Sequence, residues 1–293
     1  MHFKKLALIG CGLIGGSFAL ALKRAQSVAL VSGFSASERS REKALALNVI
    51  DESAPSIQSA VEGADLVLVA VPVNAMASCL SSIQEHLAKD VLVMDVGSTK
   101  TQIMEAAQVA MKDRFSCFVP AHPIAGKERH GVEHAEAELF DHHQTILTPN
   151  AQTDPQKIDL AAQVWQAVGS SVSIMSPQEH DQALAAVSHL PHLIAFAAVN
   201  AIADQPKRDL ILSLAGPGFR DFSRIAASAP SVWLDIFLSN QAEVLDQLKM
   251  FKSAISDFES ALQAGENQAL TDLIESASTV RKEWLPKGSP PKS

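Results

Sequence analysis

Short apolar runs alternate with segments of helical periodicity over residues 1–175. The runs lack the polar alternation of a strand with one exposed face, a pattern that is typical of parallel strands covered on both faces. Strands are predicted at residues 6–9, 28–34, 65–71, 91–95, 117–120, 144–148 and 171–175. Helices are predicted directly after the first strand and at residues 42–48, 75–87, 101–111 and 155–168. The alternation indicates an α/β domain built on a parallel sheet.

The first predicted strand leads directly into a G-x-G-x-x-G motif, Gly10 to Gly15, and then into an Ala-rich apolar helix. In this context Gly10 permits a tight turn, Gly12 lets the backbone approach a diphosphate, and Gly15 lets the helix pack close to the strand. The helix N-terminus offers free N–H groups to the phosphates. We therefore predict a Rossmann-type dinucleotide-binding domain over residues 1–175. Its predicted cofactor-binding residues are Gly10, Gly12, Leu13, Ile14 and Gly15, with Val71 and Pro72 at the end of another strand.

Two other interpretations of this stretch are weaker. A secretory or lipoprotein signal anchored at Cys11 would need a small-residue cleavage context, which is missing. The apolar run is also too short, and too interrupted by glycine, to span a membrane. A chance motif in a glycine-containing loop is disfavoured by the flanking strand and helix.

The end of the second predicted strand bears on the choice of cofactor. In such domains this position faces the adenosine ribose, and NAD sites usually carry Asp or Glu there. Here the position is Ser35, followed by Ser37, Arg39 and Arg41. Hydroxyl and guanidinium groups suit a 2′-phosphate, which a carboxylate would repel. We therefore expect NADP to be preferred over NAD, with Arg39 as the nearer cation, or Arg41 in its place if the loop turns one residue later. The alternative is that the arginines only solvate the start of a helix.

The pattern becomes helical from Ser176, where Pro177 can occupy the first position of a capped helix. This helix is apolar nearly all round, and a kink is expected at Pro191. A second long helix is predicted at residues 230–265, with an apolar seam over residues 237–262 that suits a partner helix and predicts a homodimer. The expected domains are the Rossmann-type domain at 1–175, an all-helical substrate and dimerisation domain at 176–286, and a flexible tail at 287–293.

Composition narrows the class of protein. Apolar residues make up 47% of the chain and charged residues 19%, which is typical of a soluble globular enzyme rather than a disordered or membrane protein. The formal net charge is −8 without a basic patch, so no nucleic-acid partner is expected. Cys11, Cys79 and Cys117 show no C-x-x-C spacing and favour a reduced, cytoplasmic protein without a metal site.

Two polar residues stand near the expected nicotinamide position. His122 follows a predicted strand, and there it could accept a proton from a substrate hydroxyl. The alternative is a structural histidine in front of a turn proline, Pro123. Ser98 lies at the carboxyl end of another predicted strand, where ligands bind in such folds.

Further candidates lie in the helical part. His189 and His192 share one face of an apolar helix, where polar groups must be paired or functional. His180 points the opposite way on a straight helix, so the three histidines share a pocket only if the helix bends or a second subunit contributes. Arg220 and Arg224 follow a Gly-Pro-Gly turn and are available to clamp a carboxylate.

Several segments, in order along residues 6–237, resemble the prephenate dehydrogenase family: IGCGLIGGSFA, AVPV, DVGSTK, HPIAGKERHG, SHLPHLIAFA, GFRDFSRIA and SVWLDIF. The resemblance implies oxidative decarboxylation of prephenate or arogenate in tyrosine biosynthesis, with hydride transfer to NAD(P). It implies His122 as the acceptor of the substrate's hydroxyl proton, Ser98 as the residue that orients this hydroxyl, and Arg224 as the carboxylate ligand. The other pocket residues that it implies are His189, His192, Trp233 and, at the side-chain end of the substrate, Glu128.

The resemblance also suggests feedback inhibition by tyrosine. The charge of Glu128 would favour the ammonium group of arogenate, so we expect arogenate to be used and prephenate to be the second candidate. Two other classes stay open. One is another Rossmann-plus-helical oxidoreductase, of the 3-hydroxyacid dehydrogenase or pyrroline carboxylate reductase type, and the other is a non-catalytic nucleotide-binding regulator.

Overall fold

The computed structural model describes residues 1–127 and 129–284. Within them the chain forms two compact units, Met1–Asn240 and a second unit that begins at Gln241. Glu128 and the tail predicted at residues 287–293 lie outside the described residues. The domain boundary predicted after residue 175 lies inside the first unit, which therefore contains the α/β part together with the first helices of the helical part.

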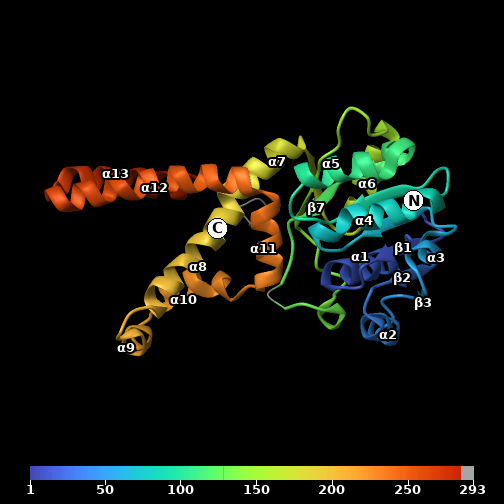
Figure 1. Cartoon of the computed structure of the whole chain (residues 1–293), viewed down its shortest axis with the longest axis horizontal. Helices are drawn as coiled ribbons and strands as arrows, with labels where there is room; N and C mark the ends of the chain where they lie inside the picture. Colours follow the sequence, from blue (N-terminus) through green and yellow to red (C-terminus); the bar gives the residue numbers. More distant parts are fainter. Residues whose placement is uncertain (128, 285–293) are drawn as a thin grey trace, which may run out of the picture. The chain divides into compact units, whose positions relative to one another are not determined.

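A six-stranded parallel sheet forms the centre of the first unit, in the order β3-β2-β1-β4-β5-β6. Figure 1 labels β1, β2 and β3 of this sheet. Because β1 lies between β2 and β4, the strand order reverses there, and the carboxyl ends of β1 and β4 form the crevice in which such folds bind ligands. This arrangement confirms the predicted Rossmann-type domain. The strands are β1 (Leu6–Ile9), β2 (Val31–Phe34), β3 (Glu52–Ser53), β4 (Leu66–Val69), β5 (Leu92–Asp95) and β6 (Phe118–Val119).

Helices cover both faces of this sheet, which explains why its strands carry uninterrupted apolar runs. Leu6 and Leu8 of β1 enter one hydrophobic core, and Ala7 and Ile9 enter the other. The first core is closed by α1 (Leu13–Arg24) and α6 (Pro155–Ala167), and the second by α3 (Ile57–Val61), α4 (Val73–Ile83) and α5 (Thr101–Met111).

A second, three-stranded sheet was not predicted as a separate layer. Its order is β7-β8-β9, with β7 antiparallel and β9 parallel to β8. The chain leaves the parallel sheet at Pro120, which has no N–H to donate, and enters β7 directly. His122 follows β6 as predicted, and it is also the middle residue of β7, a strand that was not predicted. The strands are β7 (Ala121–Pro123), β8 (Gln144–Leu147) and β9 (Ser171–Ile174).

The region after β2 also differs from the prediction. The Ser37 side chain accepts a hydrogen bond from the Ser40 N–H and caps α2 (Glu38–Ala46), so this helix begins at Glu38 rather than at residue 42. The edge strand β3 was missed because it is short, exposed and polar. Three short 3₁₀ helices lie later in the chain: η1 (Gln84–His86), η2 (Lys112–Cys117) and η3 (Val132–His134).

The helical part of the first unit begins at the Ser176 cap, as predicted. Ser176 and Glu179 form a reciprocal capping box at the start of α7. The irregularity expected at Pro191 is a π-helical turn in front of it, η4, between α7 and α8. The elements are α7 (Pro177–Leu184), η4 (Ala185–His189), α8 (Leu190–Ala203), α9 (Arg208–Ser213), α10 (Pro217–Ser223), η5 (Arg224–Ala227) and α11 (Pro230–Ser239).

The single helix predicted at residues 230–265 is wrong. It is interrupted at Asn240, whose backbone φ of −122° and ψ of 33° are not helical. The Asn240 side chain is buried and hydrogen-bonded inside the first unit, which competes with helix continuation. The second unit contains α12 (Gln241–Ala264) and α13 (Asn267–Glu283).

Candidate active site

A cavity of about 840 Å³ opens in the first unit between the loop that follows β7, the η4–α8 segment and the η5–α11 segment. Four of the residues singled out from the sequence line it: His122, His192, Arg224 and Trp233. They come from positions up to 111 residues apart in the chain, from β7 to α11. The fold thus places an imidazole and a guanidinium around one cavity.

The backbone around His122 is held by a buried ion pair. Lys100 Nζ lies 2.6 Å from Asp95 Oδ2, and both side chains are fully buried. Lys100 Nζ also donates to the Ala121 carbonyl at 2.7 Å, and Asp95 Oδ1 accepts from the Ala121 N–H at 3.1 Å. Because Asp95 ends β5, the pair fixes β7, and with it His122, against the parallel sheet.

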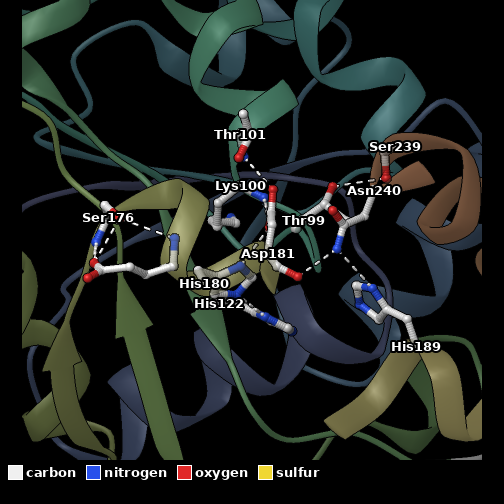
Figure 2. Close-up of polar contacts among 12 residues, drawn as sticks. Thr99, Lys100, Thr101, His122, Ser176, His180, Asp181, His189, Ser239 and Asn240 are labelled. Atoms are coloured by element: carbon white, nitrogen blue, oxygen red, sulfur yellow. Dashed lines mark hydrogen bonds and ion pairs between the residues drawn. The ribbon is translucent and has the colours of Figure 1, made fainter. Parts of the chain in front are cut away.

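His122 is the end of a chain of side-chain hydrogen bonds (Figure 2). Its Nδ1 lies 2.8 Å from Nε2 of His180, and Nδ1 of His180 lies 2.8 Å from Oδ1 of Asp181. Asp181 in turn accepts from the backbone N–H groups of Lys100 and Thr101, each at 2.8 Å. In Figure 2 Asp181 lies beside Lys100 and Thr101 at the start of α5, and His180 and then His122 follow on the other side of Asp181.

Burial keeps the histidines of this site neutral. The pKa of His122 lies well below its usual 6.5 because burial disfavours the charged ring, with further lowering by His180, Lys100 and His189. The pKa of His180 is also lowered by burial, against the opposing effect of the Asp181 hydrogen bond. A neutral imidazole at physiological pH can accept a proton, as a general base must.

His192 and Trp233 form one wall of the cavity. Their rings are stacked with centroids 3.6 Å apart and an interplanar angle of 22°. His192 Nδ1 donates to the Ser188 carbonyl at 2.9 Å, which leaves Nε2 available. The pKa of His192 is lowered by burial and also by the nearby Arg224 cation. The stack and the guanidinium therefore lie at the same end of the cavity.

His189 does not occupy the pocket position that the resemblance implied. It is 1% exposed and is absent from the cavity lining. Its Nδ1 accepts a hydrogen bond from Asn240 Nδ2 at 3.1 Å, and the same amide donates to the Asp181 carbonyl at 2.8 Å. Burial lowers the pKa of His189 to about 4. The His189 side chain thus contacts the Asn240 amide that also binds Asp181, and it does not face the cavity.

Two other candidates among the described residues do not line the cavity. Ser98 is partly buried in the loop between β5 and α5, one residue before the buried Thr99. Arg220 is exposed on α10 and does not line the cavity, whereas Arg224 does. Glu128 lies outside the described residues.

The glycine motif forms a cradle that fits a dinucleotide diphosphate. Gly10 has a φ of +103°, and a Cβ there would lie 2.2 Å from the Ala70 carbonyl oxygen. A Cβ at Gly15 would lie 2.4 Å from the Gly10 oxygen, whereas a Cβ at Gly12 would meet no atom within 4 Å. Gly12 therefore faces open space at the start of α1, which carries neither a side-chain cap nor an acidic residue in its first turn.

The other predicted cofactor residues surround this cradle. Leu13 and Ile14 form the first turn of α1, and Val71 and Pro72 follow β4 at the switch point. Cys11 lies inside the motif, and burial raises the pKa of its thiol to about 11. A neutral thiol adds no negative charge beside the expected phosphates.

Arg41 lies at the end of β2, where the ribose end of the cradle is expected. Arg41 donates to the Ser35 carbonyl, and its guanidinium lies 5.6 Å from the Phe34 ring centroid. Arg39 is exposed in the first turn of α2. The structure places Arg41 against the end of β2, and the prediction that Arg39 is the cation nearer to the 2′-phosphate stays a prediction.

Family models match most of the chain. Residues 18–174 match the prephenate dehydrogenase nucleotide-binding domain, and residues 176–276 match the prephenate dehydrogenase dimerization domain. The chain belongs to the prephenate dehydrogenase family. Membership supports a prephenate dehydrogenase function in tyrosine biosynthesis and a pyridine nucleotide cofactor, and it excludes the other oxidoreductase families that the sequence left open.

Similar proteins agree with this assignment. The chain is 37% identical to a cyclohexadienyl dehydrogenase of Zymomonas mobilis, over 95% of each protein. It is 36% identical to a prephenate dehydrogenase of Bacillus subtilis, over 83% of this chain and 66% of that protein. The crystal structure of prephenate dehydrogenase from Aquifex aeolicus, in complex with hydroxyphenyl propionate and NAD⁺, superposes with a TM-score of 0.90 at 32% identity, over 97% of this chain and 99% of that one.

Sequence reasoning missed four residues of the hydrogen-bonded network. Two of them lie in the segment DVGSTK, which was quoted for its family resemblance, and the other two lie in predicted helices. Asp181 directly follows a histidine, which is the one local signal that could have marked it. The missed residues are Asp95, Lys100, Asp181 and Asn240.

Proposed function

We propose that this dehydrogenase oxidises and decarboxylates prephenate, and also arogenate, with an NAD(P) cofactor. The observation that supports this best is the placement of the neutral His122 imidazole and the Arg224 guanidinium around one cavity. The substrate is a cyclohexadienol that carries a hydroxyl and a ring carboxylate. Its oxidation needs a base that takes the hydroxyl proton and a cation that binds an anionic group of the substrate.

In this mechanism His122 Nε2 accepts the proton of the substrate's 4-hydroxyl while ring C4 loses hydride. The bound dinucleotide would accept that hydride. The C–C bond to the ring carboxylate then breaks, CO₂ leaves, and the bond's electron pair makes the ring aromatic. His122 returns its proton to the same oxygen, so the reaction yields a phenol with no net proton change.

Arg224 would hold a carboxylate of the substrate through charge-assisted hydrogen bonds, next to the His192–Trp233 stack. The stack presents an apolar ring face to the cavity, which suits the flat product ring. Ser98 would orient the 4-hydroxyl from the loop after β5, as the resemblance implies.

The proposal is tested by absorbance at 340 nm with purified protein, prephenate or arogenate, and either cofactor. We expect reduction of the cofactor with at least one of the two substrates. If Glu128 reaches the ammonium end, arogenate is used with the higher kcat/KM. Absence of reduction in all four combinations would contradict the proposed function.

The cofactor prediction concerns the loop after β2. Ser35 supplies no carboxylate for the ribose diol, and Arg41 lies against its backbone. We expect a higher kcat/KM for NADP than for NAD, and a reversed order in Ser35→Asp, because the new carboxylate binds the diol and repels the 2′-phosphate. Steady-state kinetics with both cofactors measure this. A wild-type preference for NAD would contradict the interpretation of this loop.

The assembly prediction is a homodimer built through the helical part. The helix Pro177–Ala203 is apolar enough to cross a membrane by composition, and only 22% of its most apolar window is buried. Its polar groups His180 and Asp181 are hydrogen-bonded within the site, which favours a protein neighbour over lipid. The later part of the seam on α12 is exposed at two positions, with Ile255 50% and Leu262 66% exposed, whereas Val244 near the start of the helix is buried. Because residues 176–276 match a dimerization domain, we propose that a second copy of the chain covers these apolar surfaces.

Light scattering should give twice the mass of the chain at micromolar concentration. Ile255→Lys combined with Leu262→Lys should shift the protein towards monomer, because charges replace buried apolar contacts at the interface. Val109→Lys on α5, where the side chain is 79% exposed, is the matched control and should leave the mass unchanged. A monomeric wild type would refute the assembly.

Two further properties complete the proposal. Tyrosine, the product from arogenate, has the same phenolic oxygen and carboxylate that His122 and Arg224 would bind, so it should compete with the substrate. A cytoplasmic location agrees with the free, buried thiols of Cys11, Cys79 and Cys117.

A further inference from the structure

We propose that His180 and Asp181 are positioning residues for the base: they hold His122 in the tautomer whose Nε2 lone pair faces the substrate, and they share the charge that His122 gains. The inference rests on the proposed function and extends it to two residues that lie outside the cavity lining. It follows from the direction of each hydrogen bond between Asp181 and His122.

The direction is set at Asp181. An ionised carboxylate only accepts hydrogen bonds, so the 2.8 Å contact requires His180 Nδ1 to carry the hydrogen. A neutral His180 then has a lone pair on Nε2, and the 2.8 Å contact to His122 requires His122 Nδ1 to donate. The remaining nitrogen of His122, Nε2, is left with a lone pair. That is the form a general base needs.

Asp181 cannot rotate out of this arrangement. Its Oδ1 accepts from the Lys100 N–H and its Oδ2 from the Thr101 N–H, each at 2.8 Å, at the positive end of α5. The pKa of Asp181 is lowered: burial acts to raise it, but hydrogen bonds from His180 and from Thr101 outweigh that effect. The acceptor at the end of the chain therefore stays ionised and fixed.

The charges around His122 make Asp181 the group that stabilises a cation there. Lys100 and Asp95, from the β5 side, form a closed ion pair, and His180 and His189, from α7 and η4, are neutral. Asp181 on α7 is the remaining formal charge in this hydrogen-bonded set within the described residues, and it reaches His122 through His180. A proton gained at Nε2 can be balanced by this carboxylate without moving a solvent ion into the buried site.

The first test is Asp181→Asn, which keeps the size of the side chain and removes the charge. Where the amide N–H₂ of the Asp181→Asn variant faces His180, Nδ1 of His180 must accept a hydrogen bond, so His180 carries its hydrogen on Nε2. His180 Nε2 then donates to His122 Nδ1. His122 must therefore carry its own hydrogen on Nε2, where the base needs a lone pair. We expect kcat to fall by about 10²- to 10⁴-fold, with the KM for substrate and the Kd for the cofactor changed less than threefold. The acidic limb of the kcat profile should move to lower pH, because the imidazolium has lost its counter-charge.

The second test separates positioning from folding. In His180→Gln the amide oxygen can still accept from His122 Nδ1, whereas His180→Leu offers no acceptor. We expect the Gln variant to keep at least about tenfold more kcat than the Leu variant, in the range of one general-base contribution. Glu179→Gln, in the exposed capping box two residues before Asp181, is the matched control and should keep wild-type kinetics. Equal losses in the Gln and Leu variants, or losses confined to KM, would overturn the inference.

A third measurement does not depend on turnover. ¹⁵N NMR of histidine-labelled free protein, assigned with His122→Ala, should show His122 hydrogenated at Nδ1 in wild type and at Nε2 in Asp181→Asn. The same tautomer in both proteins would refute the positioning role even if the enzyme is active. An inactive wild type with the expected tautomer would leave the relay in place and refute the proposed function instead.

Discussion

Replacing His122 with alanine should lower kcat for the preferred substrate by about 10²- to 10⁴-fold, because the variant has no group to take the hydroxyl proton as hydride leaves. Binding of the cofactor should be almost unchanged, because the glycine cradle lies on β1 and α1 rather than on β7. Steady-state kinetics and a fluorescence titration of the cofactor measure the two effects. His86→Ala, an exposed histidine on η1, is the control. If His122→Ala keeps the wild-type kcat at saturating substrate, His122 is structural.

The pH dependence follows from the same residue. His122 acts only when its ring is neutral, and burial holds its pKa well below 6.5. Protonation of His122 therefore removes activity only at pH values well below 6.5. We expect kcat/KM to be constant around pH 6.5 and to decline only at more acidic pH. A limb centred at or above 6.5 would mean that a different group titrates.

Replacing Arg224 with alanine should raise the KM for substrate about 10- to 100-fold, because hydrogen bonds to charged groups contribute roughly 1.5–3 kcal/mol and a carboxylate would be left unpaired. Arg224→Lys should recover only part of this loss, since an ammonium cannot reproduce the two-pronged geometry of guanidinium. Arg220→Ala is the matched control, because Arg220 lies four residues away but outside the cavity lining. A raised KM in Arg220→Ala with an unchanged KM in Arg224→Ala would move the clamp to Arg220.

The sequence was most informative where local chemistry determines local structure. The glycine motif predicted the position of the diphosphate cradle because each glycine has a steric reason. A side chain at Gly10 or Gly15 would clash with neighbouring backbone, and Gly12 leaves open space for a ligand. The Ser176 cap likewise marked the start of α7. The family resemblance then assigned His122, Arg224 and Trp233, and these do gather at one cavity.

The remaining features depend on contacts between distant segments. No local pattern shows that Asn240 will leave a helix to bond Asp181 and His189, or that Asp95 and Lys100 will hold β7. The choice between a bent helix and a second subunit for the three histidines was also open. In the structure the π-helical turn η4 changes the angular position of later side chains relative to His180, and of the three histidines only His192 lines the cavity.

That π-helical turn makes the site sensitive to chain length rather than to side-chain chemistry. A π turn amounts to one extra residue inserted into an α-helix, and one residue of α-helix corresponds to about 100° of rotation. Deleting a single residue such as Val187, an exposed residue at the rim of the cavity, would restore regular helix geometry and turn His192 away from Trp233, although every imidazole, indole and guanidinium of the cavity would still be present. Relatives that lack this extra residue would have to build the same pocket wall from different positions, so alignment gaps here carry as much functional information as substitutions do.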